Sequence, residues 1–82
     1  MARIIDGEKA NYVGEQVRKF RIERKMSQKT LSEKLETMAV YICRGSIARI
    51  EGGTRTVTDM ELYALSKILN KPMESFFENI DD

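Results

Sequence analysis

The sequence contains no histidine, no tryptophan, one proline and a single cysteine, Cys43. Without histidine, the chain lacks the commonest metal ligand and the commonest general base among side chains. A lone cysteine cannot form a disulfide within the chain, which is typical of proteins that stay in the reducing cytoplasm. These absences argue against a metal site, a cofactor and histidine-based catalysis, so we expect no metal, no cofactor and no enzyme activity.

Long apolar runs are also missing. The first ten residues, "MARIIDGEKA", lack the apolar core of a secretory signal. No stretch approaches the roughly 20 apolar residues that cross a bilayer. The 82 residues are 41% hydrophobic and 33% charged, which is the composition of one globular domain of modest stability. We therefore expect a cytoplasmic protein without a membrane partner.

The small net charge hides an asymmetry along the chain. Residues 1–56 contain twelve Lys and Arg against seven Asp and Glu, a balance of +5, whereas residues 57–82 contain two against six, a balance of −4. A basic part beside an acidic part favours a face for a polyanion. Many neutral domains have a similar split, so the asymmetry alone does not decide the function.

Apolar residues at helical spacing predict two helices in the first half of the chain. Residues 1–10 carry no clear period and are interpreted as an N-terminal arm. The first helix should begin after the N-cap Asn11 and end near Lys25, and the second should run from Gln28 to about Met38 with Ser27 as its N-cap. The expected buried residues of these two helices are Val13, Val17 and Phe20, then Leu31, Leu35 and Met38.

The second half of the chain predicts three more helices and no confident strand. A partly extended link, "AVYI", precedes a helix from Arg44 to Glu51 that the pair Gly52-Gly53 ends. The stretch "TDME" is a capping box that opens the next helix, which carries Leu62, Leu65, Ile68 and Leu69 and ends at Asn70. Pro72 can begin a short fifth helix with Met73, Phe76 and Phe77. The predicted fold class is all-α with five helices.

Two long segments carry a family resemblance. "VGEQVRKFRIERKMSQKTLSEKL", followed by "GSIARIEGGTRTVTDMELYALSKILNKPMESFF", resembles the Cro and phage-repressor (XRE-like) type of helix-turn-helix domain. The resemblance implies a lambda-repressor-like domain over residues 11–80 after the arm at residues 1–10. It implies a sequence-specific transcriptional regulator that binds double-stranded DNA, with repression expected, in a bacterial or phage setting at the nucleoid. We also expect a homodimer, weak or DNA-dependent, that matches a palindromic site.

The sequence departs from the family pattern at three places. The connection "ETMAVYICRG" is several residues longer than the usual link between the two motif helices. Lys25 stands where the family often has glycine, and Cys43 stands where a Ser or Thr usually caps the recognition helix. Cysteine is a poorer N-cap than either.

The resemblance also implies which residues touch DNA, because the family inserts its second motif helix into the major groove. The base-contacting positions would be Arg44, Gly45, Ser46 and Arg49. The DNA-backbone contacts would be Gln28 at the start of the second helix, with Lys29, Thr54, Arg55 and Thr56 beside the groove. On spacing alone, ordinary solvated charges are the favoured interpretation of Arg44 and Arg49, and the flanking residues could be plain surface positions.

Arg21 and Glu51 need a joint interpretation. Arg21 follows Val17 by four residues and Glu51 follows Ile47 by four, so both charges fall on inward helix faces. An unpaired buried charge is costly, so we expect the two to form a structural ion pair. The family has such a pair.

Several alternatives stay open at this point. The runner-up function is an antitoxin-type or other protein-interaction module on the same fold. Cys43 could be a redox sensor near the DNA face, although a half-buried packing role is the simpler interpretation. The adjacent Phe76 and Phe77 cannot both enter one small core, so we expect the homodimer contact to involve the fifth helix, with one of these rings partly exposed.

Overall fold

The computed structural model describes residues 9–78, and in this part of the chain it contains helices only. Four α-helices are followed by a short 3-10 helix: α1 (Gly14–Glu23), α2 (Gln28–Glu36), α3 (Arg44–Glu51), α4 (Asp59–Leu69) and η1 (Met73–Phe77). The all-α prediction is confirmed, and the expected fifth α-helix is instead the 3-10 helix η1. None of the helices in residues 9–78 is long and apolar enough to cross a membrane.

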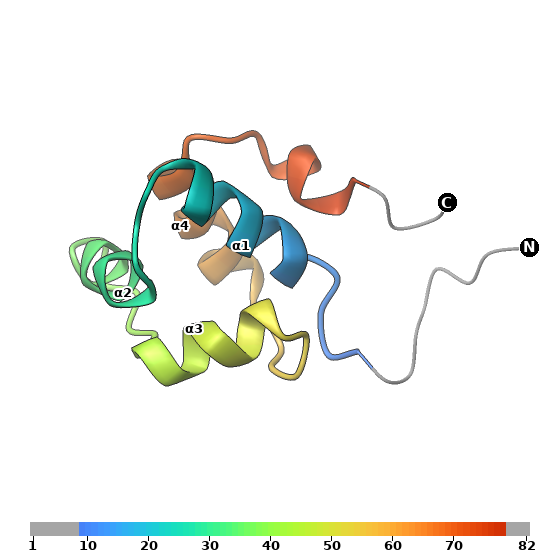
Figure 1. Ribbon diagram of the computed structural model, residues 1–82, viewed down its shortest axis with the longest axis horizontal. Helices are drawn as coiled ribbons and strands as arrows, with labels where there is room; N and C mark the ends of the chain where they lie inside the picture. Colours follow the sequence, from blue (N-terminus) through green and yellow to red (C-terminus); the bar gives the residue numbers. More distant parts are fainter. Residues whose placement is uncertain (1–8, 79–82) are drawn as a thin grey trace, which may run out of the picture.

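Helix α3 runs along the lower edge of the molecule in Figure 1, and α2 lies at the left, seen almost end-on. Both α1 and α2 pack against α3, whereas α4 packs against α2, α1 and η1. Residues 1–8 of the expected arm and residues 79–80 of the expected domain lie outside the described part of the chain.

Local capping explains why three helix ends fall where the sequence predicts. The Ser27 hydroxyl accepts a hydrogen bond from the Thr30 N–H at 3.0 Å and opens α2. At the start of α4, Thr58 and Glu61 form the full capping box, with reciprocal bonds of 3.1 and 3.0 Å. Asn70 closes α4 in the left-handed conformation at φ 55°. Each of these ends depends on a residue within three positions of it, which is why the local sequence predicts it.

The start of α1 is a correction to the sequence-based boundary. Helix α1 begins at Gly14, with Val13 rather than Asn11 at the N-cap. The Asn11 amide nevertheless accepts from the Gly14 N–H at 2.8 Å, and it donates to the backbone carbonyls of Ile50 and Arg55 at 3.1 and 2.7 Å. A Cβ at Gly14 would overlap the Ile50 carbonyl oxygen. Asn11 and Gly14 therefore bring the start of α1 against the end of α3.

Helices α1 and α2 both end earlier than expected, at Glu23 and Glu36. Lys25 and Ala39, which follow them, adopt left-handed backbone conformations with φ of 57° and 61°. This conformation is unfavourable for residues with a Cβ. Met38 lies beyond the last residue of α2, and it is 39% exposed rather than buried as predicted.

The core lies between the four α-helices and η1. Its buried side chains are Val13, Val17, Phe20, Leu31, Leu35, Ile42, Ile47, Ile50, Leu62, Ala64, Leu65, Leu69 and Phe76. Phe20 and Phe76 meet edge to face, with ring centroids 5.1 Å apart. Phe76 is buried and Phe77 is about half exposed, so the two aromatic rings do point in different directions.

Candidate nucleic-acid interface

Helix α3 has one buried face and one exposed face. Ile47 and Ile50 are fully buried against α1 and α2. On the opposite face Arg44, Gly45, Ala48 and Arg49 are exposed, and Ser46 is partly exposed. Nothing lies within 4 Å of the position that a Cβ would take at Gly45. The exposed face of α3 therefore presents the guanidinium groups of Arg44 and Arg49, with only small side chains between them.

The first turn of α3 is held by side chains rather than by a conventional N-cap. Cys43 occupies the N-cap position without a capping hydrogen bond from its side chain. Its thiol donates to the Ser46 hydroxyl at 3.4 Å, and Arg49 Nη2 donates to the same hydroxyl at 2.8 Å. When the thiol loses its proton, the Ser46 hydroxyl can donate to the thiolate, and this lowers the pKa of Cys43. Cys43 is exposed, not half-buried as its packing interpretation required.

A buried ion pair joins α1 to the end of α3. Arg21 Nε donates to Glu51 Oε2 at 2.7 Å and Arg21 Nη2 to Glu51 Oε1 at 3.1 Å. The two side chains are only 11% and 4% exposed. Arg21 Nη1 also donates to the Met26 carbonyl at 2.7 Å. The pair thus fixes the orientation of α3 relative to α1 and to the turn before α2.

Gln28 belongs to the same network. Its amide Nε2 donates to Glu51 Oε1 at 3.1 Å, so the Glu51 carboxylate accepts three hydrogen bonds from two helices. The bond ties the first residue of α2 to the last residue of α3. A second amide N–H of Gln28 remains for an external acceptor. Lys29, the next residue, is exposed.

The segment after α3 carries the remaining predicted contact residues. Thr54 and Thr56 are exposed, and the Thr54 N–H donates to the Arg49 carbonyl at 2.9 Å. Arg55 is turned toward α4, where Nη1 and Nη2 each donate to the Glu61 carboxylate at 3.1 Å. This pairing raises the pKa of Arg55 and lowers that of Glu61. Arg55 therefore has part of its charge neutralised within the chain.

Comparison with known proteins identifies the fold and the family. A helix-turn-helix family model matches residues 17–76, which is most of the chain. The chain belongs to the lambda-repressor-like (XRE) helix-turn-helix family. No curated protein sequence matches it. A crystal structure of the DNA-binding domain of BldD shares the fold with a TM-score of 0.68 and 21% identity, over 88% of this chain and 97% of that one.

As a helix-turn-helix protein, the molecule is a DNA-binding protein and not an enzyme. In the family's terms, α2 and α3 correspond to the two motif helices. Within residues 9–78 no group of three or more metal-ligating side chains occurs.

Sequence reasoning missed three residues at this helix-turn-helix surface. Ala48 follows Arg44 by four residues and shares its exposed face, so the helical period could have identified it. Tyr41 is 75% exposed just before α3, as its alternation with Val40 and Ile42 indicates. Asn11 was expected only as a cap, and its bonds to Ile50 and Arg55 had no signal in the sequence.

Proposed function

We propose that this protein is a sequence-specific transcriptional repressor that binds a palindromic operator in double-stranded DNA as a homodimer. The observation that carries the proposal is the exposed face of α3, where Arg44 and Arg49 flank the open position at Gly45. A helix of this kind fits the major groove, and a guanidinium can bond bidentately to O6 and N7 of guanine.

Base readout is assigned to Arg44, Gly45, Ser46 and Arg49. The absence of a side chain at Gly45 lets the backbone of α3 approach the base edges closely. Ser46 holds Arg49 through the 2.8 Å hydrogen bond, so the Arg49 guanidinium is oriented before DNA arrives. The exposed methyl group of Ala48 can contact a thymine methyl group.

Binding to the DNA backbone is assigned to Gln28, Lys29, Thr54, Arg55 and Thr56. The start of α2 presents backbone N–H groups, which favour a phosphate. The bond from Gln28 to Glu51 sets the spacing between this phosphate site and α3. Since Arg55 already pairs with Glu61, Lys29 is the better single test of a phosphate contact.

Repression is proposed because occupancy of an operator within a promoter is enough to exclude the polymerase, whereas activation needs a further contact. A dimer matches the symmetry of a palindromic site and places two recognition helices about 34 Å apart, one helical turn of DNA. The protein would act in the cytoplasm, at the nucleoid.

The test compares Arg44→Ala and Lys29→Ala on a selected duplex, on singly altered duplexes and on random DNA at several salt concentrations. Arg44→Ala should lose about 1–3 kcal/mol on the selected duplex and relax the preference at one base pair. Lys29→Ala should weaken all duplexes similarly and lower the salt slope by about 0.9 per lost phosphate contact. If Arg44→Ala weakens random DNA as much as the selected site, the base-reading assignment is wrong.

A further inference from the structure

The outward face of α4 carries large apolar side chains that are exposed to solvent. Met60 is 75% exposed and Tyr63 is 51% exposed. Together with Met38, Val40, Asp59, Ala64 and Met73 they line a shallow groove of about 500 Å³. Large exposed apolar side chains gathered at one groove mark an interaction site.

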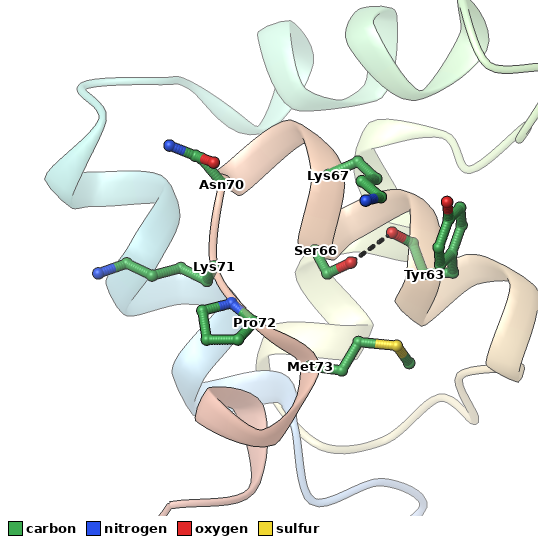
Figure 2. Close-up of a pocket in the computed structure, with 7 residues that line it drawn as sticks. All are labelled: Tyr63, Ser66, Lys67, Asn70, Lys71, Pro72 and Met73. Carbon is green, nitrogen blue, oxygen red and sulfur yellow. Dashed lines mark hydrogen bonds between the residues drawn. The ribbon is translucent and has the colours of Figure 1, made fainter.

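Charged residues of opposite sign stand at the two ends of this face. Asp59 lies four residues before Tyr63 and Lys67 lies four residues after it, and both are exposed. Figure 2 shows Tyr63 and Lys67 on the same side of α4, with Lys71 pointing away from them. Lys67 Nζ lies 5.2 Å from the centroid of the Tyr63 ring. Neither Asp59 nor Lys67 takes part in the ion pairs formed within residues 9–78.

The equal spacing makes this face complementary to itself. Four residues of α-helix span about 6 Å, so Asp59 and Lys67 lie at equal distances on either side of Tyr63. If two α4 helices meet antiparallel around a two-fold axis at Tyr63, Asp59 of each copy faces Lys67 of the other. A two-fold contact requires this kind of self-complementary patch.

We propose that the groove on α4 is the contact between two copies of this chain, with their α4 helices antiparallel across Tyr63. The two Tyr63 rings meet at the axis, and Met60 of each copy enters the groove between Met38 and Met73 of the other. This inference rests on the homodimer proposed above and specifies its surface. It places the contact on α4 and on Met73 of η1 rather than on Phe77.

The proposed contact leaves the recognition helices accessible. All seven residues that line the groove lie outside α3. Helix α4 packs against α2, α1 and η1, and in Figure 1 it lies above α3, which occupies the lower edge. A dimer formed through α4 can therefore keep the exposed faces of both α3 helices free for DNA.

Charge exchange tests the proposal, with sedimentation equilibrium over a range of protein concentrations as the measurement. Asp59→Lys and Lys67→Glu should each weaken self-association at least about tenfold, because each variant puts two like-charged pairs in contact. An equimolar mixture of the two variants should associate as a heterodimer, and the double variant D59K/K67E should regain wild-type association. Glu74→Lys and Lys19→Glu are the matched controls, since both residues are exposed and lie outside the groove.

The rescue by mixing separates a lost contact from a misfolded variant, because an unfolded chain cannot be rescued by its partner. Wild-type protein that stays monomeric at all concentrations and on DNA would overturn the inference. Single variants that associate like wild type would also overturn it, as would an equimolar mixture of the two variants that does not associate although both are folded. A monomeric chain whose groove is occupied by a different protein would overturn it too. If the charge exchange works as expected but the dimer shows no preference among duplexes, the interface stands and the proposed function fails.

Discussion

Removing one partner of the Arg21–Glu51 pair should cost much of the stability of this domain. The Glu51 carboxylate is 4% exposed and accepts two hydrogen bonds from Arg21 and one from Gln28. Truncation of Arg21 leaves this charge buried with a single amide partner. Breaking a buried pair in this way costs about 3–5 kcal/mol. A domain of 82 residues has a free energy of unfolding of about 4–12 kcal/mol, so the loss is a large fraction of the total.

The assay is urea unfolding followed by circular dichroism for wild type, Arg21→Ala, Glu51→Ala and the double variant. The double variant should lose less than the sum of the two single losses, with a coupling of about 1–3 kcal/mol, because it leaves no charge unpaired. The apolar replacement R21M/E51L should have a free energy of unfolding within about 1 kcal/mol of the wild-type value, or above it. Glu23→Ala is the matched control: the Glu23–Lys71 pair is longer, at 3.6 Å, and much more exposed, so its loss should cost less than about 1 kcal/mol.

Two results would refute this reasoning. One is an Arg21→Ala protein as stable as wild type, which would mean that Glu51 does not need its partner. The other is strict additivity of the two single losses, which would show that the two side chains act independently and that the effect comes from lost packing.

Three further predictions concern individual residues. Gly14→Ala should destabilise the domain by roughly 1–3 kcal/mol, because a Cβ there overlaps the Ile50 carbonyl, whereas Gly45→Ala should stabilise it by about 0.5–1 kcal/mol and weaken duplex binding. Urea unfolding and a binding titration measure these effects, and a change in stability of the opposite sign at either glycine would contradict the prediction. Ala39→Gly should stabilise the folded state by up to about 1 kcal/mol, because glycine adopts the left-handed conformation at φ 61° without strain. Ala48→Gly inside α3 should instead lower the stability by about 1 kcal/mol. Equal losses of stability at the two positions in thermal unfolding would rule this out. The hydrogen bonds from Arg55 depress the pKa of Glu61 in the folded state, so the stability that this pair contributes is present above the pKa of an unfolded glutamate and is lost as the pH falls through the lower folded value. The difference in free energy of unfolding between wild type and Arg55→Ala, measured at pH 7, 5 and 3, should therefore shrink on acidification, and a constant difference would contradict the assignment.

The sequence predicted the elements whose ends are determined locally. The bounds of α3, the capping box of Thr58 and the left-handed Asn70 all depend on residues within one turn of the helix end. The apolar period also identified most of the core, since a buried helix face repeats regularly. These features need no knowledge of distant parts of the chain.

The misses occur where distant contacts override local preference. Lys25 and Ala39 take left-handed conformations that neither residue type favours, and they end α1 and α2 early. Asn11 is a good N-cap by type, yet α1 starts at Gly14, and the Asn11 amide binds the Gly14 N–H together with the carbonyls of Ile50 and Arg55. No local pattern encodes a partner about 40 positions away.

Some features of the candidate site could also be predicted from the sequence, and others could not. The exposed face of α3 follows from the positions of Ile47 and Ile50, so Arg44, Gly45 and Arg49 could be placed from the sequence. That Gln28 binds Glu51 could not be placed, because the bond depends on how α2 and α3 pack. The pairing of Arg55 with Glu61, six residues away, depends on the path of the loop before α4, which no helical period encodes. These pairings change which residues are available to DNA.

Selection of bound duplexes from a random pool tests most directly whether α3 reads DNA sequence. Wild-type protein should enrich a palindrome whose half-sites lie about one helical turn apart, and the Arg44→Ala protein should enrich a site with relaxed preference at one base pair of each half. Failure of the wild-type protein to enrich any sequence over the starting pool, although it binds duplexes, would contradict sequence-specific recognition by this helix.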